Sequence, residues 1–172
     1  MHRPDAWDQT EAEQGGFQKM QAGAYILKIV DAKESISQKG ANMLVLKLDI
    51  AQGIHKDNYF TLSKKVNADC LLKYYRLTDG ENLPRFKGDI LAIEQSNAGF
   101  KFDFDERKLV GKLIGGNLRS EEYENKNGEI KQNLKVAYIF PVNELDKHAP
   151  LEPKKLTKTP KPVENDYPWD NQ

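Results

Sequence analysis

Residues 43–50, which read Met-Leu-Val-Leu-Lys-Leu-Asp-Ile, decide the fold class of this chain. Leucine or isoleucine stands at every second position from Leu44 to Ile50, and Lys47 and Asp49 stand between them. Successive side chains of an extended strand point to opposite faces, so this alternation predicts a strand with one buried face. We therefore expect a fold built mainly from β-strands.

Strand patterns continue on both sides of this segment. Residues 24–34 are rich in β-branched and aromatic side chains, and a turn over residues 38–42 joins them to the 43–50 strand. Residues 57–62 predict a third strand. Two long segments, 110–123 and 129–140, flank an Asn-Gly pair at 127–128, which between β-like runs predicts a hairpin. Residues 100–104 also alternate, as a short extra strand would.

Helical patterns lie in the middle of the chain. Asn67 is a candidate N-cap for a helix over residues 68–76. Leu83, Phe86, Ile90 and Ile93 follow helical spacing, and the stretch 96–99 provides a stop for this second helix. A strand over residues 89–95 is the alternative, and it fits the alternation less well.

The predicted order is three strands, a helical insert and two long strands, which is the order of an OB-fold. We expect a mainly β fold: a five-stranded OB-fold barrel with a helical insert between strands 3 and 4, plus disordered termini. Other small β-barrels give a similar order. The predicted domains are a flexible acidic arm (1–19), the OB-fold domain (20–147) and a proline-rich tail (148–172), which holds five of the eight prolines.

Composition excludes several protein classes. The chain has 172 residues and a formal net charge of zero, with 20 basic against 18 acidic side chains between residues 20 and 147. No run of about 18 apolar residues is available for a transmembrane helix, and the N-terminus lacks the apolar run of a signal peptide. We expect a cytoplasmic protein with no membrane partner. A single cysteine, Cys70, rules out an internal disulfide, and with three scattered histidines it argues against a zinc site.

A divalent-metal nuclease is the third and weakest alternative, because no arrangement of catalytic residues stands out in the sequence. The glycine-rich run 111–116 lacks the Gly-Lys-Ser/Thr of a phosphate-binding loop, and it is better explained as a strand that bends. Acidic residues at 103–106 and 121–124 are of the type that binds magnesium, but they lie in or beside predicted turns. We expect no enzyme activity, no catalytic residue, no metal and no cofactor.

Aromatic and basic residues are interleaved, as single-stranded nucleic acid requires: cations for phosphates and ring faces for bases. Some of these rings will be core residues instead, and the balanced charge weakens the pattern. Phe60, Tyr74, Tyr75 and Arg76 belong to the interleaved set without an assigned contact. The hypothesised contacts are Lys47, Lys64, Lys65, Lys112, Arg119, Lys131 and Lys135 for phosphates and Tyr59, Tyr123 and Tyr138 for bases.

The end of the chain carries a candidate partner-binding motif, Asp166-Tyr167-Pro168-Trp169-Asp170, in which an aromatic ring follows proline among acidic residues. Such a segment can dock its ring in a basic-rimmed pocket of another protein. A similar stretch, Asp5-Ala6-Trp7-Asp8, lies at the other end, and no role is assigned to Trp7.

Several motifs resemble a family of small proteins from phages and prophages of Gram-positive hosts. They are Gly23-Ala24-Tyr25 opening a strand, Lys39-Gly40 before Met43-Leu44, residues 93–100 (Ile-Glu-Gln-Ser-Asn-Ala-Gly-Phe), Leu109-Val110-Gly111-Lys112, Glu121-Glu122-Tyr123 and Asn127-Gly128. The resemblance covers roughly residues 23–142. It implies an OB-fold protein that binds single-stranded DNA and is encoded near recombination and replication genes.

The C-terminal tip also resembles that of bacterial single-stranded-DNA-binding proteins, which end in acidic residues followed by Ile-Pro-Phe. Here Tyr167-Pro168-Trp169 matches that order, but three further residues follow Trp169, whereas in the bacterial proteins the aromatic residue is the last.

We therefore expect sequence-independent binding of single-stranded DNA in phage or prophage replication or recombination, in the host bacterial cytoplasm. The C-terminal tail is expected to recruit phage or host replication and recombination proteins. The alternative is a protein-interaction adaptor with an OB-like body that binds no nucleic acid. A single OB domain with long strands can form a homo-oligomer, a dimer or a tetramer, and the sequence does not determine the oligomeric state. It also does not distinguish DNA from RNA as the ligand.

Overall fold

The computed structural model describes residues 20–157. Five strands form one antiparallel sheet: β1 (Gly23–Ile36), β2 (Asn42–Ile50), β3 (Leu72–Leu77), β4 (Leu113–Glu124) and β5 (Ile130–Phe140). Two α-helices accompany the sheet, α1 (Asn58–Val66) between β2 and β3 and α2 (Leu83–Ser96) between β3 and β4. There are also three short 3-10 helices, η1 (Gly80–Asn82), η2 (Glu106–Leu109) and η3 (Val142–Lys147). The predicted mainly β class, the number of strands and the presence of a helix between the third and fourth strands are confirmed, but the third strand is not the segment that the sequence predicted.

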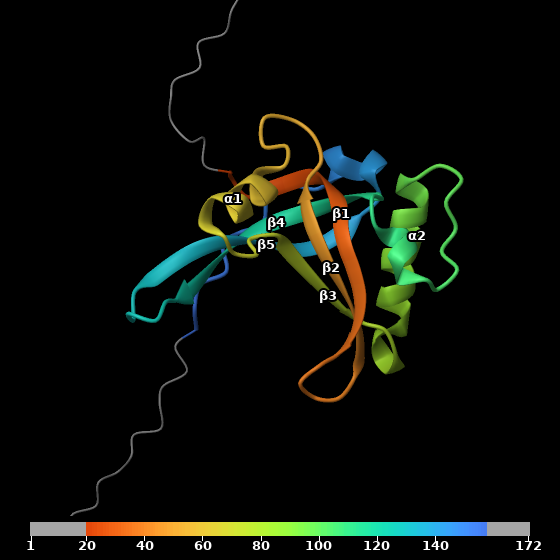
Figure 1. The fold of residues 1–172 in the computed structure, drawn as a ribbon, viewed down its shortest axis with the longest axis horizontal. Coiled ribbons are helices and arrows are strands. Elements are labelled where there is room, and N and C mark those ends of the chain that lie inside the picture. The colour runs from red at the N-terminus through yellow and green to blue at the C-terminus, as the bar shows by residue number, and fades with distance from the viewer. Residues whose placement is uncertain (1–19, 158–172) are drawn as a thin grey trace, which may run out of the picture.

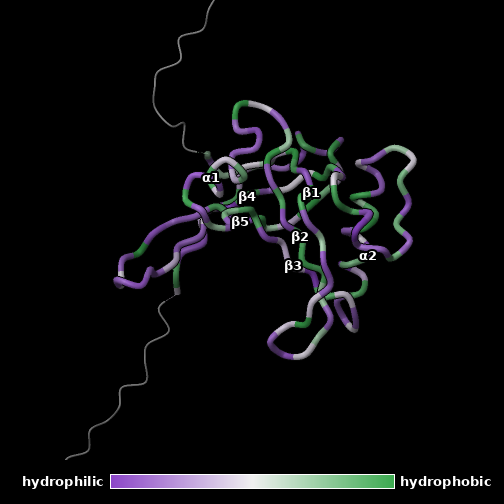
Figure 2. The backbone as a smooth tube through the Cα atoms, viewed as in Figure 1, coloured by the Kyte–Doolittle hydropathy of each residue, from purple (hydrophilic) through white to green (hydrophobic). Residues whose placement is uncertain are grey.

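The sheet runs in the order β3-β2-β1-β4-β5, so β1 lies at its centre. The predicted closed barrel is wrong: β3 and β5 are the two edge strands and do not pair with each other, so the sheet stays open. Two hairpins project from the body in different directions, β1–β2 at the bottom and β4–β5 at the left of Figure 1. Figure 2 shows that the projecting part of the β4–β5 hairpin is mostly hydrophilic, whereas apolar residues recur along the strands of the body.

The core lies on one face of the curved sheet. The buried face predicted for residues 43–50 is confirmed, because Leu46, Leu48 and Ile50 are at most 1% exposed and join Leu27 and Ile29 of β1 in the core. The opposite face is less open than predicted, because Val45 and Asp49 are buried as well. Helix α2 packs against β3, β4 and β5 and contributes Ile93, which has no exposed surface.

The strand predicted over residues 57–62 is wrong, because this segment begins helix α1. The cause is Asp49, a fully buried residue of β2. One oxygen of its carboxylate accepts from the main-chain N–H of Tyr59 at 3.0 Å, and the other accepts from Phe60 at 2.8 Å. A carboxylate from the preceding strand thus accepts hydrogen bonds from free N–H groups of the first helical turn. This interaction cannot be predicted from the aromatic-rich pattern of residues 57–62 alone.

The helix predicted over residues 68–76 is also wrong, because residues 72–77 form strand β3. Asn67 ends a helix rather than beginning one: it is the C-cap of α1, with φ 51° and its N–H bonded to the carbonyl of Ser63. Asparagine tolerates this left-handed conformation better than most residues, so the same residue type suits either end of a helix. The extra strand proposed for residues 100–104 is absent, and Phe102 instead donates its N–H to Glu94.

Other local predictions are confirmed. Helix α2 ends at Ser96, and the 125–128 segment forms the β4–β5 turn with Gly128 at φ 78°. Gly116 allows a close approach in the middle of the sheet, since a Cβ there would lie 2.4 Å from the Leu27 side chain. No helix within residues 20–157 is long and apolar enough to cross a membrane.

Residues 148–157, which the sequence assigns to the tail, contact the sheet. β1 pairs with β4 only as far as Leu118, which leaves the following part of β4 with a free edge. Lys154 lies along this edge, donating its N–H to the Ser120 carbonyl at 2.8 Å and accepting from Glu122 N–H at 3.0 Å. The described chain therefore ends beside the base of the β4–β5 hairpin.

Candidate nucleic-acid interface

A groove of about 760 Å³ lies between the two edge strands, β3 and β5, and it exists because these strands do not pair. Helix α1 bounds the groove at one end, and β4 contributes to the wall beside β5. The lining consists of Tyr59, Leu62, Cys70, residues 71–76, Glu121, Tyr123 and residues 133–137.

Two exposed tyrosines enter this groove from different strands. In β3, Leu72 and Tyr74 are buried, so the alternate residues Lys73 and Tyr75 face outward, and Tyr75 is 55% exposed. Tyr123 of β4 is 39% exposed. Exposed rings of this kind offer faces on which bases can stack. Tyr59 differs, because it packs against the core and burial raises its pKa to about 12.

The charged lining is mainly basic: Lys73, Arg76 and Lys135 stand against a single carboxylate, Glu121. Lys73 lies across the ladder from Lys47 of β2, so both lysines share the outer face next to the groove. Their ammonium nitrogens lie 3.6 and 2.9 Å from Asp69, and the hydrogen bond from Lys47 is the main cause that lowers the pKa of Asp69.

Arg76 also fixes the β3 wall in place. Its Nε donates to Asp89 of α2 at 2.5 Å, and the Tyr74 hydroxyl donates to the same carboxylate oxygen at 2.8 Å. Arg76 in turn donates to the Tyr74 hydroxyl. Burial of this network raises the pKa of the Tyr74 hydroxyl. The network ties β3 to α2, so the position of the groove wall depends on the core helix.

Glu121 holds two cations on the opposite wall. Its carboxylate accepts from Arg119 at 2.9 Å and lies 3.6 Å from the Lys135 ammonium. Burial alone would raise the pKa of Glu121, but the Arg119 hydrogen bond and the charges of Lys154 and Lys135 outweigh it, and the pKa lies below its ordinary value. The carboxylate is therefore ionised at neutral pH and neutralises part of the basic lining.

The structure gathers some of the hypothesised contacts and separates others. Tyr59, Tyr123 and Lys135 line the groove, and Lys47 borders it. Lys131 faces Tyr123 across the β4–β5 ladder, Arg119 is bonded to Glu121, and Lys64 and Lys65 are exposed on α1.

Seven of the ten hypothesised contacts lie outside the groove lining, among them Lys112 and Tyr138. Lys112 precedes β4 and places its ammonium 4.6 Å from the centre of the Phe100 ring. The Tyr138 hydroxyl accepts from Asn117 at 2.9 Å, and its ring lies against Phe140 and His148. The motif at 166–170 lies outside the described residues.

Sequence reasoning missed Lys73 and assigned no contact to Tyr75. The signal was present in residues 72–77, Leu-Lys-Tyr-Tyr-Arg-Leu, which as a strand places Lys73 and Tyr75 on one face. It was hidden by the helix predicted over the same residues.

The chain matches no protein-family model, and no curated protein gives a significant match to it. Among residues 20–157, no group of three or more His, Cys, Asp or Glu side chains is arranged to hold a metal ion.

Proposed function

We propose that this protein binds single-stranded DNA, without reading its sequence, in the groove between β3 and β5. The observation that carries the proposal is the combination of Tyr75 and Tyr123, two exposed rings, with Lys73 and Lys135 in one groove. Rings that stack on bases and cations that contact phosphates are what a single strand requires, and neither distinguishes one base sequence from another.

The strand order supports a partly open OB-fold as the framework for this activity. OB-folds are five-stranded, partly open barrels that bind oligonucleotides on the face of strands 2 and 3 and between the loops joining strands 1–2 and 4–5. Here Lys47 of β2 and Lys73 and Tyr75 of β3 share one outer face, and the β4–β5 strands form the facing wall.

The proposed biological setting is phage or prophage DNA replication or recombination, with the protein acting as a non-catalytic component. The resemblance of residues 23–142 to the phage family supports this setting. Within the same proposal, the 166–170 motif recruits partner enzymes, and deletion of residues 163–172 should abolish recruitment while leaving DNA binding intact.

The test is fluorescence anisotropy with a labelled oligonucleotide of about 30 nucleotides, longer than the roughly 16 that one OB-fold covers. Single-stranded DNA should bind more tightly than duplex, and binding should weaken as salt rises. Tyr75→Ala and Tyr123→Ala should each weaken binding by about 1–3 kcal/mol. Phe104→Ala is the matched control, because this ring is 80% exposed but lies in the loop after α2, outside the groove lining.

A protein-interaction adaptor is the second candidate, and the unpaired edges of β3 and β5 favour it. An extended peptide can add to a free strand edge through main-chain hydrogen bonds. An absence of single-strand binding at low salt would refute the DNA proposal and leave the adaptor function in its place.

A further inference from the structure

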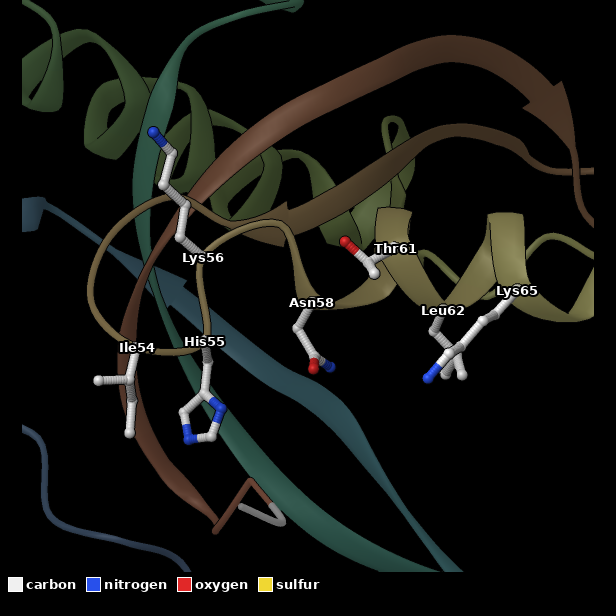
Figure 3. A pocket seen from close by; sticks show the side chains of 7 residues that line it. All are labelled: Ile54, His55, Lys56, Asn58, Thr61, Leu62 and Lys65. Carbon is white, nitrogen blue, oxygen red and sulfur yellow. The ribbon is translucent and has the colours of Figure 1, made fainter. Parts of the chain in front are cut away.

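A second hollow, of about 180 Å³, lies between helix α1 and the loop that precedes it. Figure 3 shows Ile54, His55, Asn58, Leu62 and Lys65 pointing to the same side of this loop and helix. Lys56 also belongs to the lining but points to the other side in Figure 3. The hollow is therefore built mainly from about two turns of α1, from Asn58 to Lys65, and from Ile54 and His55 of the preceding loop.

The polar groups of this hollow suit an anion. Lys65 contributes an ammonium group, Asn58 an amide and His55 an imidazole, and no carboxylate belongs to the lining. Lys65 forms no ion pair with any residue in the described range 20–157. No carboxylate of the described residues therefore neutralises its charge, in contrast to Lys47, Lys73 and Lys135 at the groove.

The hollow adjoins the groove. Leu62 lines both of them, so the two depressions meet at this side chain of α1. Lys65 of the hollow is therefore within one helical turn of the α1 end of the groove.

The neighbouring lysine of α1 is arranged differently. Lys64 holds its ammonium 4.4 Å from the centre of the Phe60 ring and lines a separate, shallow depression with Asn67 and Asp69. Two adjacent lysines of equal charge thus differ in surroundings, and only Lys65 belongs to the hollow beside the groove.

We infer that this hollow binds a backbone phosphate of a DNA strand that continues from the β3–β5 groove across α1, with Lys65 as the principal contact. The inference rests on the proposed function and extends it by naming the path of the strand. It predicts that Lys65 matters only for a strand long enough to reach past Leu62.

The experiment compares Lys65→Gln with Lys87→Gln, which changes an exposed lysine of α2 that lines neither the groove nor the hollow. Binding is measured by anisotropy with oligothymidylates of about 6 and about 16 nucleotides, within the range of OB-fold site sizes. A single-strand phosphate contact contributes about 0.7 to the slope of log K against log salt, which is about fivefold in affinity at about 0.1 M salt. Lys65→Gln should bind the long oligonucleotide about fivefold more weakly than the wild type, with a salt slope smaller by about 0.7, and should bind the short one with unchanged affinity. Lys87→Gln should bind both lengths like the wild type, and thermal melting should show that both variants are folded.

The inference is overturned if Lys65→Gln binds the long oligonucleotide with the affinity of the wild type. It is also overturned if both variants lose the same affinity for both lengths, because that result would indicate general charge attraction. Wild-type protein that binds neither length would instead refute the proposed function itself. The two failures are therefore distinguishable in one set of titrations.

Discussion

Glu121 provides a quantitative test of the groove, because it is the only carboxylate in a lining that otherwise carries three basic residues. Its carboxylate is bonded to Arg119 at 2.9 Å and lies 3.6 Å from Lys135. Glu121→Gln keeps the shape of the side chain and an oxygen that can accept from Arg119, but it removes the negative charge. Two cations then become available to phosphates.

Each phosphate contact on a single strand adds about 0.7 to the salt slope, so two freed cations should steepen it by about 1.4, and affinity at about 0.1 M salt should rise by up to about 25-fold. The measurement is anisotropy of labelled single-stranded DNA across a salt series. Glu124→Gln is the matched control, because this exposed residue of the same strand has no ion pair among residues 20–157.

The same substitution should have a small, pH-dependent effect on stability. The pKa of Glu121 is lower in the folded protein than its ordinary value of 4.5, so its ion pairs stabilise the fold above pH 4.5 and cease to do so as pH falls through the folded pKa. We expect Glu121→Gln to lower the free energy of unfolding by less than about 1 kcal/mol at neutral pH. Affinity and salt slope equal to or below those of the wild type would refute the assignment of this groove.

Three further predictions concern the framework. Asp49→Asn places an amide group where the Asp49 carboxylate accepts main-chain N–H groups, so the free energy of unfolding, measured in urea, should fall by about 1–3 kcal/mol. The control is Asp57→Asn, because the Asp57 side chain makes no cap bond, and its free energy of unfolding should fall by less than about 1 kcal/mol. Gly116→Ala should lose about 1–3 kcal/mol in the same assay, because its Cβ would meet Leu27 at 2.4 Å. The pKa of Tyr59 is about 12 in the folded protein, against an ordinary value of 10.0. The free energy of unfolding of the wild type should therefore fall as pH rises from 10 to 12, and that of Tyr59→Phe should fall less steeply.

The sequence predicted those elements whose pattern is local. The alternation of residues 43–50, the helical spacing from Leu83 to Ile93 and the Asn-Gly turn each encode their structure within a few residues, and all three are confirmed. Glycines at 115 and 116 were also correctly placed in a strand, where neighbouring side chains leave no room for a Cβ.

The segment between β2 and α2 was mispredicted because its structure depends on distant residues. Helix α1 begins where Asp49, in the preceding strand, accepts the free N–H groups of its first turn. Strand β3 forms because Leu72 and Tyr74 complete the core beside β2 and because Asp89 of α2 binds Tyr74 and Arg76. Neither interaction can be read from residues 57–76 alone.

The candidate site was likewise predictable only as far as its residues form local patterns. Aromatic and basic residues were identified as a set, but the groove that selects among them arises from two edge strands that stay apart, which is a tertiary feature. Tyr138 is an example: the aromatic and basic pattern selected it as a ring for base stacking, but His148, which follows β5, packs against its ring.

Photo-crosslinking tests the central claim most directly. Single-stranded DNA carrying 5-iododeoxyuridine would be irradiated in complex with the full chain, and the crosslinked residues mapped by mass spectrometry. Base stacking on exposed rings predicts crosslinks at Tyr75 and Tyr123, the two exposed tyrosines of the groove. Crosslinks confined to rings outside it, such as Phe104 in the loop after α2, would contradict the claim that the β3–β5 groove holds the DNA.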